Sequence, residues 1–250
     1  MLGVVVLAAG QGKRMRSPLP KVLHEAAGKP LLEHVLSAVA PLGPERTVVV
    51  VGHRAEAVEA RFAGYAGGSV EFVRQDFTLG YGTGVAFRQT ERALAGFAGD
   101  VLVLYGDGPL IRTETLRRLT RTHAAAGAGM TLLTTEVADP YGLGRIIRSP
   151  DGGVARIVEE KDATPAERLL REINPGIYVF DRHVFGLAAR LTDDNAAGEY
   201  YLTDMVDLYL GAGLPVRAVL GDDETEILGV NDPQQLELVE RLLLARGQLE

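Results

Sequence analysis

An apolar run from Gly3 to Leu7 leads directly into Ala8 to Gly12, where the side chains are small at every position but one. The apolar run predicts a buried strand. A backbone with so few side chains can approach a ligand closely and aim its N–H groups at phosphate oxygens, and Lys13, Arg14 and Lys21 add positive charge nearby. The stretch therefore predicts a phosphate-binding loop at the end of a strand.

The loop does not match either of the two best-known glycine patterns. It lacks the Gly-Lys-Ser/Thr of the Walker motif, and only Gly10 and Gly12 have the spacing of the dinucleotide pattern Gly-x-Gly-x-x-Gly. Taken alone, Gly10-Gln-Gly12 is more typical of a glycine turn with solvated basic neighbours than of a phosphate-binding loop.

The segments that follow alternate between helical and strand patterns. Leu31 to Val39 has helical spacing, whereas Thr47 to Val51 and Val101 to Tyr105 are runs typical of buried strands. We therefore expect a three-layer, Rossmann-like α/β domain with a mostly parallel sheet flanked by helices. We also expect a helix from Gly84 to Phe97 and a strand over Thr225 to Leu228.

The middle of the chain departs from this alternation. Arg145 to Arg148 and Val154 to Glu159 flank a hairpin signal, Asp151-Gly-Gly153, and Pro175 interrupts a strand pattern over Glu172 to Phe180. We expect a small antiparallel lobe over about residues 141–174. It would lie within a domain of residues 1–231, and a helix over residues 232–250 would follow, either as a C-terminal helix or as the start of a linker to an absent domain.

A second glycine-rich loop, Leu79-Gly-Tyr-Gly-Thr-Gly84, follows a strand pattern and precedes a helical one. Its hydroxyl, Thr83, would be within reach of a ligand bound there. The alternative is a flexible connector.

Asp107 directly follows the strand that ends at Tyr105. Ligands bind at the carboxyl edge of open parallel sheets, and a carboxylate there could hold a cation against a polyphosphate. The alternative is that Asp107 is a turn residue or a helix cap, although Thr113 is better placed to cap the next helix.

Several motifs together resemble the sugar-nucleotide pyrophosphorylases, which join a nucleoside triphosphate to a sugar 1-phosphate. The first is Leu7-Ala-Ala-Gly-Gln-Gly-Lys-Arg-Met15 with Leu19-Pro-Lys21. The later motifs resemble the N-acetylglucosamine-1-phosphate uridylyltransferase branch: Tyr105-Gly-Asp107, Val158-Glu-Glu-Lys-Asp-Ala-Thr164, Glu172-Ile-Asn174, Glu199-Tyr-Tyr-Leu-Thr-Asp204 and Gly229-Val-Asn231. The resemblance covers nearly the whole chain.

This resemblance implies an enzyme that forms UDP-N-acetylglucosamine and pyrophosphate from UTP and N-acetylglucosamine 1-phosphate. It implies Mg²⁺ as cofactor, held between Asp107 and Asn231, with Arg14 and Lys21 as catalytic residues. The implied nucleotide-binding residues are Leu7, Ala8, Ala9, Gly10, Lys21, Gln75, Gly82, Thr83, Tyr105, Gly106 and Asp107. The implied sugar-binding residues are Gly144, Glu159 and Asn174.

The chain departs from the family pattern at three places. The second glycine loop has two residues more than the usual Leu-Gly-Thr-Gly, Pro175 stands where Thr or Ser is usual, and Leu143 replaces a usual tyrosine. These departures leave open which glycine contacts the base, and they weaken the sugar and base assignment. Family members usually continue into a left-handed β-helix that acetylates glucosamine 1-phosphate. No such repeat precedes Glu250, so we expect no acetyltransferase activity.

The amino-acid composition limits the kinds of binding partner that we expect. The net charge of −7 argues against nucleic acid or a membrane surface, and we expect small-molecule substrates only. With no cysteine, thiolate chemistry is excluded, and nothing resembles an export signal, so we expect a cytoplasmic protein. The oligomeric state stays open.

Three alternatives remain to be tested. The chain could be a pyrophosphorylase for another base or sugar. A non-catalytic sugar-nucleotide-binding subunit is disfavoured because Arg14, Lys21, Asp107 and Asn231 are all present. A dinucleotide-dependent oxidoreductase is disfavoured because the first loop lacks the third glycine of that pattern.

Overall fold

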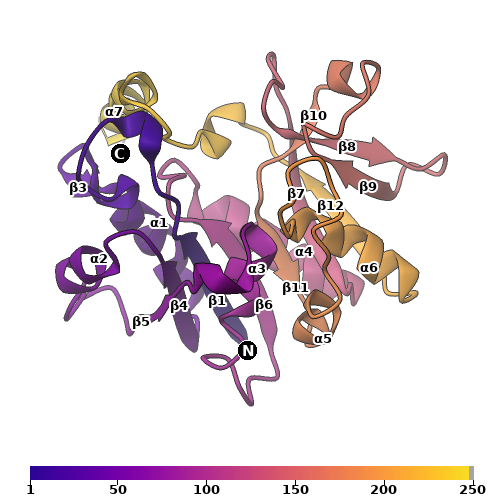
Figure 1. Cartoon of the computed structure of the whole chain (residues 1–250), viewed down its shortest axis with the longest axis horizontal. Coiled ribbons are helices and arrows are strands. Elements are labelled where there is room, and N and C mark those ends of the chain that lie inside the picture. The colour runs from indigo at the N-terminus through magenta and orange to yellow at the C-terminus, as the bar shows by residue number, and fades with distance from the viewer. Residues whose placement is uncertain (248–250) are drawn as a thin grey trace.

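The computed structural model describes residues 1–247 (Figure 1). One mixed sheet runs through the molecule, and its first four strands are parallel: β5 (Glu71–Arg74), β4 (Arg46–Val51), β1 (Leu2–Ala8) and β6 (Asp100–Tyr105). The next is β11 (Tyr178–Phe180), antiparallel to both β6 and β7 (Met130–Glu136), and β12 (Val216–Leu220) runs parallel to β7. The mostly parallel sheet expected from the sequence is therefore present.

Helices cover both faces of this sheet, because alternate side chains of the buried strands point to opposite faces and both need apolar cover. Val4 and Val6 pack in one cluster with α1 (Leu31–Val39), α2 (Ala55–Arg61) and α4 (Thr113–Ala126). Val5 and Leu7 pack in another with α3 (Thr83–Arg88), α5 (Val184–Ala188) and α6 (Met205–Gly211). The result is the three-layer arrangement expected from the alternating pattern.

A small antiparallel sheet extends from the main one, in the upper right of Figure 1. It consists of β8 (Gly144–Arg148), β9 (Val154–Val158) and β10 (Glu172–Asn174). Strands β10 and β11 follow one another along β7 in nearly one register, with Ile173 opposite Thr135 and Val179 opposite Thr131. The interrupted strand expected around Pro175 is thus confirmed.

At the interruption, Gly176 packs directly against the ring of Tyr105. A Cβ on this glycine would lie 2.0 Å from Cε2 of Tyr105, and its φ of +79° suits glycine. On one side of the break β11 pairs with β6, and on the other β10 pairs with β8. The break therefore leaves a gap between the end of β6 and the start of β8.

The last helix, α7 (Pro233–Gly247), returns to the N-terminal part of the chain, where it packs near the hairpin of β2 (Glu25–Ala26) and β3 (Lys29–Pro30). Val239 of α7 is buried with Met15 and Leu31. Asp232 caps the helix, since its Oδ1 accepts a hydrogen bond from the N–H of Gln235 at 2.8 Å. Residues 248–250 of the expected helix lie outside the described residues.

Three local expectations are wrong. Thr225 to Leu228 is no strand, because Asp223 accepts hydrogen bonds from the N–H and hydroxyl of Thr225 and starts a 3₁₀ turn at Glu224–Ile227. The helix after Gly84 ends at Arg88 instead of reaching Phe97, and turns follow it. Thr113 lies inside α4 and donates its hydroxyl to the carbonyl of Ala38, so it is no cap.

Within residues 1–247, no helix is both long and apolar enough to cross a membrane.

Candidate active site

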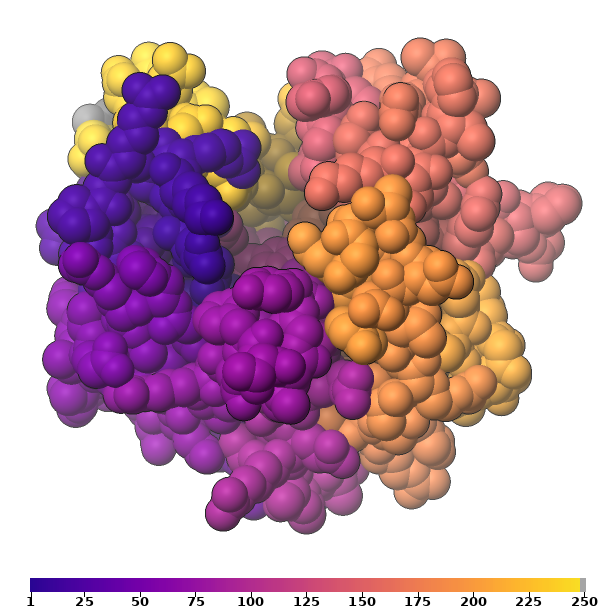
Figure 2. All heavy atoms as spheres, viewed as in Figure 1, coloured from indigo at the N-terminus to yellow at the C-terminus, as the bar shows by residue number. Residues whose placement is uncertain are grey.

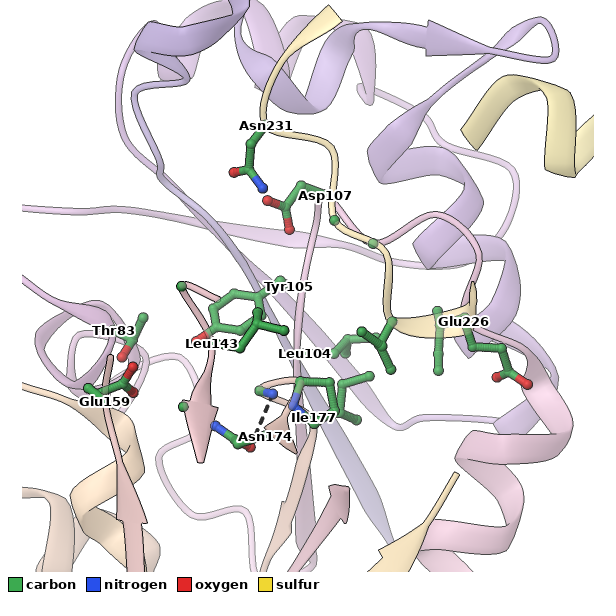
Figure 3. Close-up of a pocket in the computed structure, with 18 residues that line it drawn as sticks. Thr83, Leu104, Tyr105, Asp107, Leu143, Glu159, Asn174, Ile177, Glu226 and Asn231 are labelled. Carbon is green, nitrogen blue, oxygen red and sulfur yellow. Dashed lines mark hydrogen bonds between the residues drawn. The ribbon is translucent and has the colours of Figure 1, made fainter. Parts of the chain in front are cut away.

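Two adjoining pockets lie at the carboxyl edge of the parallel strands, and Figure 2 shows the hollow between the indigo N-terminal residues and the salmon antiparallel sheet. The N-terminal pocket, about 450 Å³, is lined by both glycine loops. The central pocket, about 320 Å³, lies in the gap between β6 and β8 (Figure 3). Thr83, Tyr105 and Asp107 line both pockets, so the two open into one another there.

The first glycine loop forms one wall of the N-terminal pocket. Leu7, Ala8, Ala9 and Gly10 all line it, because β1 ends at Ala8 and the chain continues without large side chains. Gly12 has a φ of +60°, and a Cβ there would lie 2.8 Å from the Cβ of Lys21. The close approach brings Lys21 to the same pocket.

The second glycine loop is joined to the Glu199–Asp204 motif by backbone pairing. The N–H of Tyr200 donates to the carbonyl of Tyr81 at 2.9 Å, and the N–H of Gly84 donates to the carbonyl of Tyr200 at 2.8 Å. Thr83 Oγ1 accepts from the N–H of Leu202 at 3.0 Å. These bonds hold Gly82 and Thr83 at the pocket wall, where Gln75 also lies after β5. The loop is thus an anchored element and no flexible connector.

Lys21, Asp107 and Asn231 meet where the pockets join. The ammonium of Lys21 forms an ion pair with the carboxylate of Asp107 and donates to Asn231 Oδ1 at 3.0 Å. Two hydrogen bonds donated by backbone N–H groups hold Asp107 and Asn231 in place. Val230 N–H donates to the carbonyl of Asp107 at 2.9 Å, and Asn231 N–H donates to Gln235 Oε1 at 2.8 Å. Residues more than 200 positions apart in sequence are thereby brought into direct contact.

The donor set at this point fits a small cation. Asp107 and Asn231 offer a carboxylate and an amide oxygen, the hard ligands that Mg²⁺ prefers, and both already contact one positive group. Among the described residues, no cluster of three or more His, Cys, Asp or Glu could hold a metal. A Mg²⁺ here would therefore take its remaining ligands from water and substrate phosphates.

The central pocket presents hydrogen-bonding groups from β8, from β10 and from Glu159, which directly follows β9 (Figure 3). Asn174 Nδ2 donates to the hydroxyl of Tyr178 at 2.7 Å, and Asn174 Oδ1 accepts from the N–H of Gly176 at 3.2 Å. Glu159 Oε1 accepts from the hydroxyl of Thr203 at 3.0 Å, and burial raises the pKa of its carboxyl. A Cβ on Gly144 would lie 3.5 Å from Glu159 Oε1, so this glycine leaves the carboxylate accessible.

Burial also affects Tyr105, whose ring lies between the pockets. Desolvation raises the pKa of its phenol, and the charges of Glu159 and Asp107 act in the same direction. Tyr105 is therefore neutral, and it lines both pockets.

Of the residues expected from the sequence, all but two line a pocket. Arg14 is exposed and borders a neighbouring hollow with Lys13 and the start of α7. Gly106 lines neither pocket, because its N–H donates to the carbonyl of Leu7 at 3.0 Å and its Cα faces Ala8 and Leu32. The roles assigned to these two residues stay predictions.

Sequence reasoning missed several residues that the structure places at the site. Glu199 lines the N-terminal pocket, and Thr203 and Tyr178 form hydrogen bonds with the side chains of Glu159 and Asn174. Thr203 and Glu199 lie in a quoted motif and could have been found there. Tyr178 carries no such signal, because its pattern is that of any core strand residue.

Comparisons with known proteins agree with this geometry. Residues 4–203 match the MobA-like NTP transferase domain family. The bifunctional protein GlmU of Pelotomaculum thermopropionicum is 48% identical over 246 residues, which cover 98% of this chain and 52% of that protein. The same protein of Acidovorax sp. (strain JS42) is 49% identical over 245 residues, covering 96% and 50%. The chain thus spans about half the length of these relatives.

A solved structure shares the fold. It is described as a glucose-1-phosphate thymidylyltransferase of Bacillus anthracis, with a TM-score of 0.78 at 19% identity, over 97% of this chain and 95% of that one. The fold class expected from the sequence and the family recognised from its motifs are thereby confirmed. This chain belongs to the MobA-like NTP transferase domain family.

Proposed function

We propose that the chain transfers a uridylyl group from UTP to N-acetylglucosamine 1-phosphate, giving UDP-N-acetylglucosamine and pyrophosphate. The observation that carries this proposal is the meeting of two pockets at Lys21, Asp107 and Asn231. One pocket has the groups that suit a triphosphate, the other has those that suit a sugar, and cation-binding atoms lie at the junction. The similarity to the bifunctional protein GlmU supports the choice of substrates.

The nucleotide would occupy the N-terminal pocket. Backbone groups of Leu7 to Gly10 would face its phosphates, with Lys21 beside them, and Gln75, Gly82 and Thr83 would face the nucleoside. Arg14 would reach the leaving pyrophosphate from the neighbouring hollow, and Lys13 could assist it.

The sugar would occupy the central pocket. Glu159 and Asn174 would bind its polar groups together with the N–H of Gly144, because buried hydroxyls need partners. The antiparallel lobe of residues 141–174 would thus bind the sugar, within a nucleotidyltransferase domain of residues 1–231 that precedes α7. The cytoplasmic location stays a prediction.

The reaction needs alignment more than proton transfer. A phosphate oxygen of the sugar 1-phosphate attacks the α-phosphorus, the bond to the bridging oxygen of the β-phosphate breaks, and pyrophosphate leaves with that electron pair. Because the nucleophile is already an anion, no general base is required. Lys21 and the loop N–H groups neutralise charge on the phosphates and hold the two reactants in line. Mg²⁺ held by Asp107 and Asn231 would supply further charge neutralisation.

A panel of nucleoside triphosphates and sugar 1-phosphates, assayed for pyrophosphate release, tests the substrates. We expect UTP with N-acetylglucosamine 1-phosphate to give the highest kcat/KM. If another pair gave the highest kcat/KM, the chain would be a pyrophosphorylase for that nucleotide and that sugar. Binding of UDP-N-acetylglucosamine without turnover of any pair would favour a non-catalytic binding subunit.

The metal assignment has its own test. Asp107→Asn should raise the Mg²⁺ concentration needed for half-maximal rate more than Asn231→Ala, because it removes the charged ligand. Chelation should abolish turnover and leave the circular dichroism spectrum unchanged. Turnover that persists in chelator, or a metal requirement unchanged in both variants, would contradict a shared Mg²⁺ site.

A further inference from the structure

The lengthened second glycine loop places a tyrosine at the N-terminal pocket. Tyr81 lines this pocket together with Gln75 and Phe77, yet 59% of its surface remains exposed. Glycines flank it on both sides, Gly80 with φ +120° and Gly82 with φ +110°. These two backbone conformations, which other residues rarely adopt, set the direction of the Tyr81 side chain.

The exposure of Tyr81 does not come from a loose loop. Its carbonyl accepts from the N–H of Tyr200 at 2.9 Å, and a Cβ on Gly82 would lie 2.4 Å from the carbonyl oxygen of Tyr200. The backbone on either side is therefore held closely against the Glu199–Asp204 segment. An anchored backbone with an uncovered ring is a preorganised contact surface.

One neighbouring ring supports Tyr81. The ring centroid of Phe77 lies 5.8 Å from that of Tyr81, with the two planes inclined at 33°. Within the described residues, no hydrogen bond engages the Tyr81 hydroxyl or the carboxamide of Gln75. An aromatic face and a free carboxamide in one pocket are the groups that bind a planar heterocycle, one by stacking and the other at its edge.

We propose that Tyr81 stacks on the nucleobase of the bound nucleotide and contributes affinity for it. This role rests on the proposed function, since it assigns the base to the part of the N-terminal pocket next to Gln75. The same loop thus brings an aromatic ring to the pocket and holds Thr83 in its bond with Leu202.

Binding of uridine 5′-monophosphate and of ribose 5-phosphate, measured by calorimetry, separates the base from the rest of the ligand. We expect Tyr81→Ala to weaken uridine monophosphate binding by about 5- to 150-fold, the range for one stacked base. Affinity for ribose 5-phosphate should stay unchanged. Tyr81→Phe should bind both ligands as the wild type does, because the phenyl ring also stacks.

Leu79→Ala is the matched control, since Leu79 lies in the same loop, is 61% exposed and does not line the pocket. It should leave both affinities unchanged. Wild-type affinity for uridine monophosphate in Tyr81→Ala would overturn the stacking role alone. An equal loss of affinity for both ligands would also overturn it, because that result would show that the substitution deforms the loop itself. A wild-type protein that binds no nucleotide would overturn the proposed function, and the stacking role with it.

Discussion

Lys21 contacts both proposed Mg²⁺ ligands and also lines the N-terminal pocket. Its ammonium contacts Asp107 and Asn231, the two residues expected to bind Mg²⁺, while its side chain is only 13% exposed. A divalent cation entering between these oxygens would displace the ammonium, because two positive charges in contact repel strongly in a partly buried site. The displaced ammonium would then be free to bind phosphate in the pocket that Lys21 already lines.

Replacing Lys21 by alanine should therefore have two opposite effects. Turnover should fall by about 100-fold or more, because a charge-stabilising group is lost. Mn²⁺, as a probe for Mg²⁺ in electron paramagnetic resonance, should bind the nucleotide-free variant more tightly than the wild type. Lys29→Ala, at an exposed lysine, is the control and should change neither quantity. Weaker Mn²⁺ binding in Lys21→Ala would show that the ammonium does not compete for these oxygens.

Tyr178 acts on the site from the core. It is completely buried in β11, yet its hydroxyl accepts from Asn174 Nδ2 and so fixes how that carboxamide faces the central pocket. We expect Tyr178→Phe to raise KM for the sugar 1-phosphate several-fold and to leave KM for the nucleotide unchanged.

Tyr209→Phe provides the control for Tyr178→Phe. Tyr209 is equally buried, but its hydroxyl bonds to Asp181 and lines neither pocket. Both variants lose one buried hydroxyl, and denaturant unfolding should show a loss of about 1 kcal/mol for Tyr178→Phe and about 1.5–3 kcal/mol for Tyr209→Phe, whose hydroxyl bonds to a carboxylate. A positioning role for Tyr178 is wrong if the two variants have the same KM for the sugar phosphate.

Among the elements, the interrupted strand β10–β11 decides the shape of the site. A continuous strand would pair with β6 and β8 along one line and close the gap between them. The break at Pro175–Gly176 instead lets the Tyr105 ring occupy the space beside Gly176, and the central pocket opens next to it.

Gly176→Ala tests this arrangement through stability. Alanine at φ +79° costs about 1–2 kcal/mol for backbone strain, and the added methyl group would also clash with Tyr105. Gly152→Ala isolates the first effect, because Gly152 has φ +84° and nothing within 4 Å of the added Cβ. Urea unfolding should show a larger loss for Gly176→Ala. Equal losses would mean that the ring contact imposes no restriction.

At the scale of the whole molecule, a cluster of four acidic residues lies where the antiparallel sheet packs against α6. Burial raises the pKa of Asp204 to about 6, and the charges of Asp207, Glu159 and Asp162 add to this effect. Glu159 and Asp162 follow β9, whereas Asp204 and Asp207 lie at α6. Their mutual repulsion destabilises the folded state when they are ionised.

The sign of the pH dependence follows from the raised pKa. Between pH 3.8 and about 6 the folded state binds more protons than the unfolded state, so the stability contributed by protonated Asp204 is complete below pH 3.8 and is lost as pH rises through 6. Asp204→Asn should therefore raise the thermal midpoint at pH 7.5 and leave it nearly unchanged at pH 4. The exposed Asp194→Asn should show no such difference. An equal rise of the thermal midpoint at both pH values would exclude the ionisation of Asp204 as the cause of the rise.

The sequence by itself determined the layered fold and identified most of the expected residues that line the two pockets. Strands such as β1 and β6 are apolar on both faces, a pattern that only cover by helices on each side satisfies, and the motifs at their carboxyl ends are local in the chain. The predictions failed where a single side-chain bond outweighed local propensity, as at Asp223 and Thr225.

The tertiary structure alone decided which distant groups touch. The contact of Lys21 with Asn231, the bond of Tyr178 to Asn174 and the exposure of Tyr81 beside Gln75 depend on how strands and loops pack in space. The spacing of apolar residues indicates which face of a helix or strand is buried, but it does not indicate which other element packs against that face. Contacts across the sheet edge therefore appear only when the chain is folded.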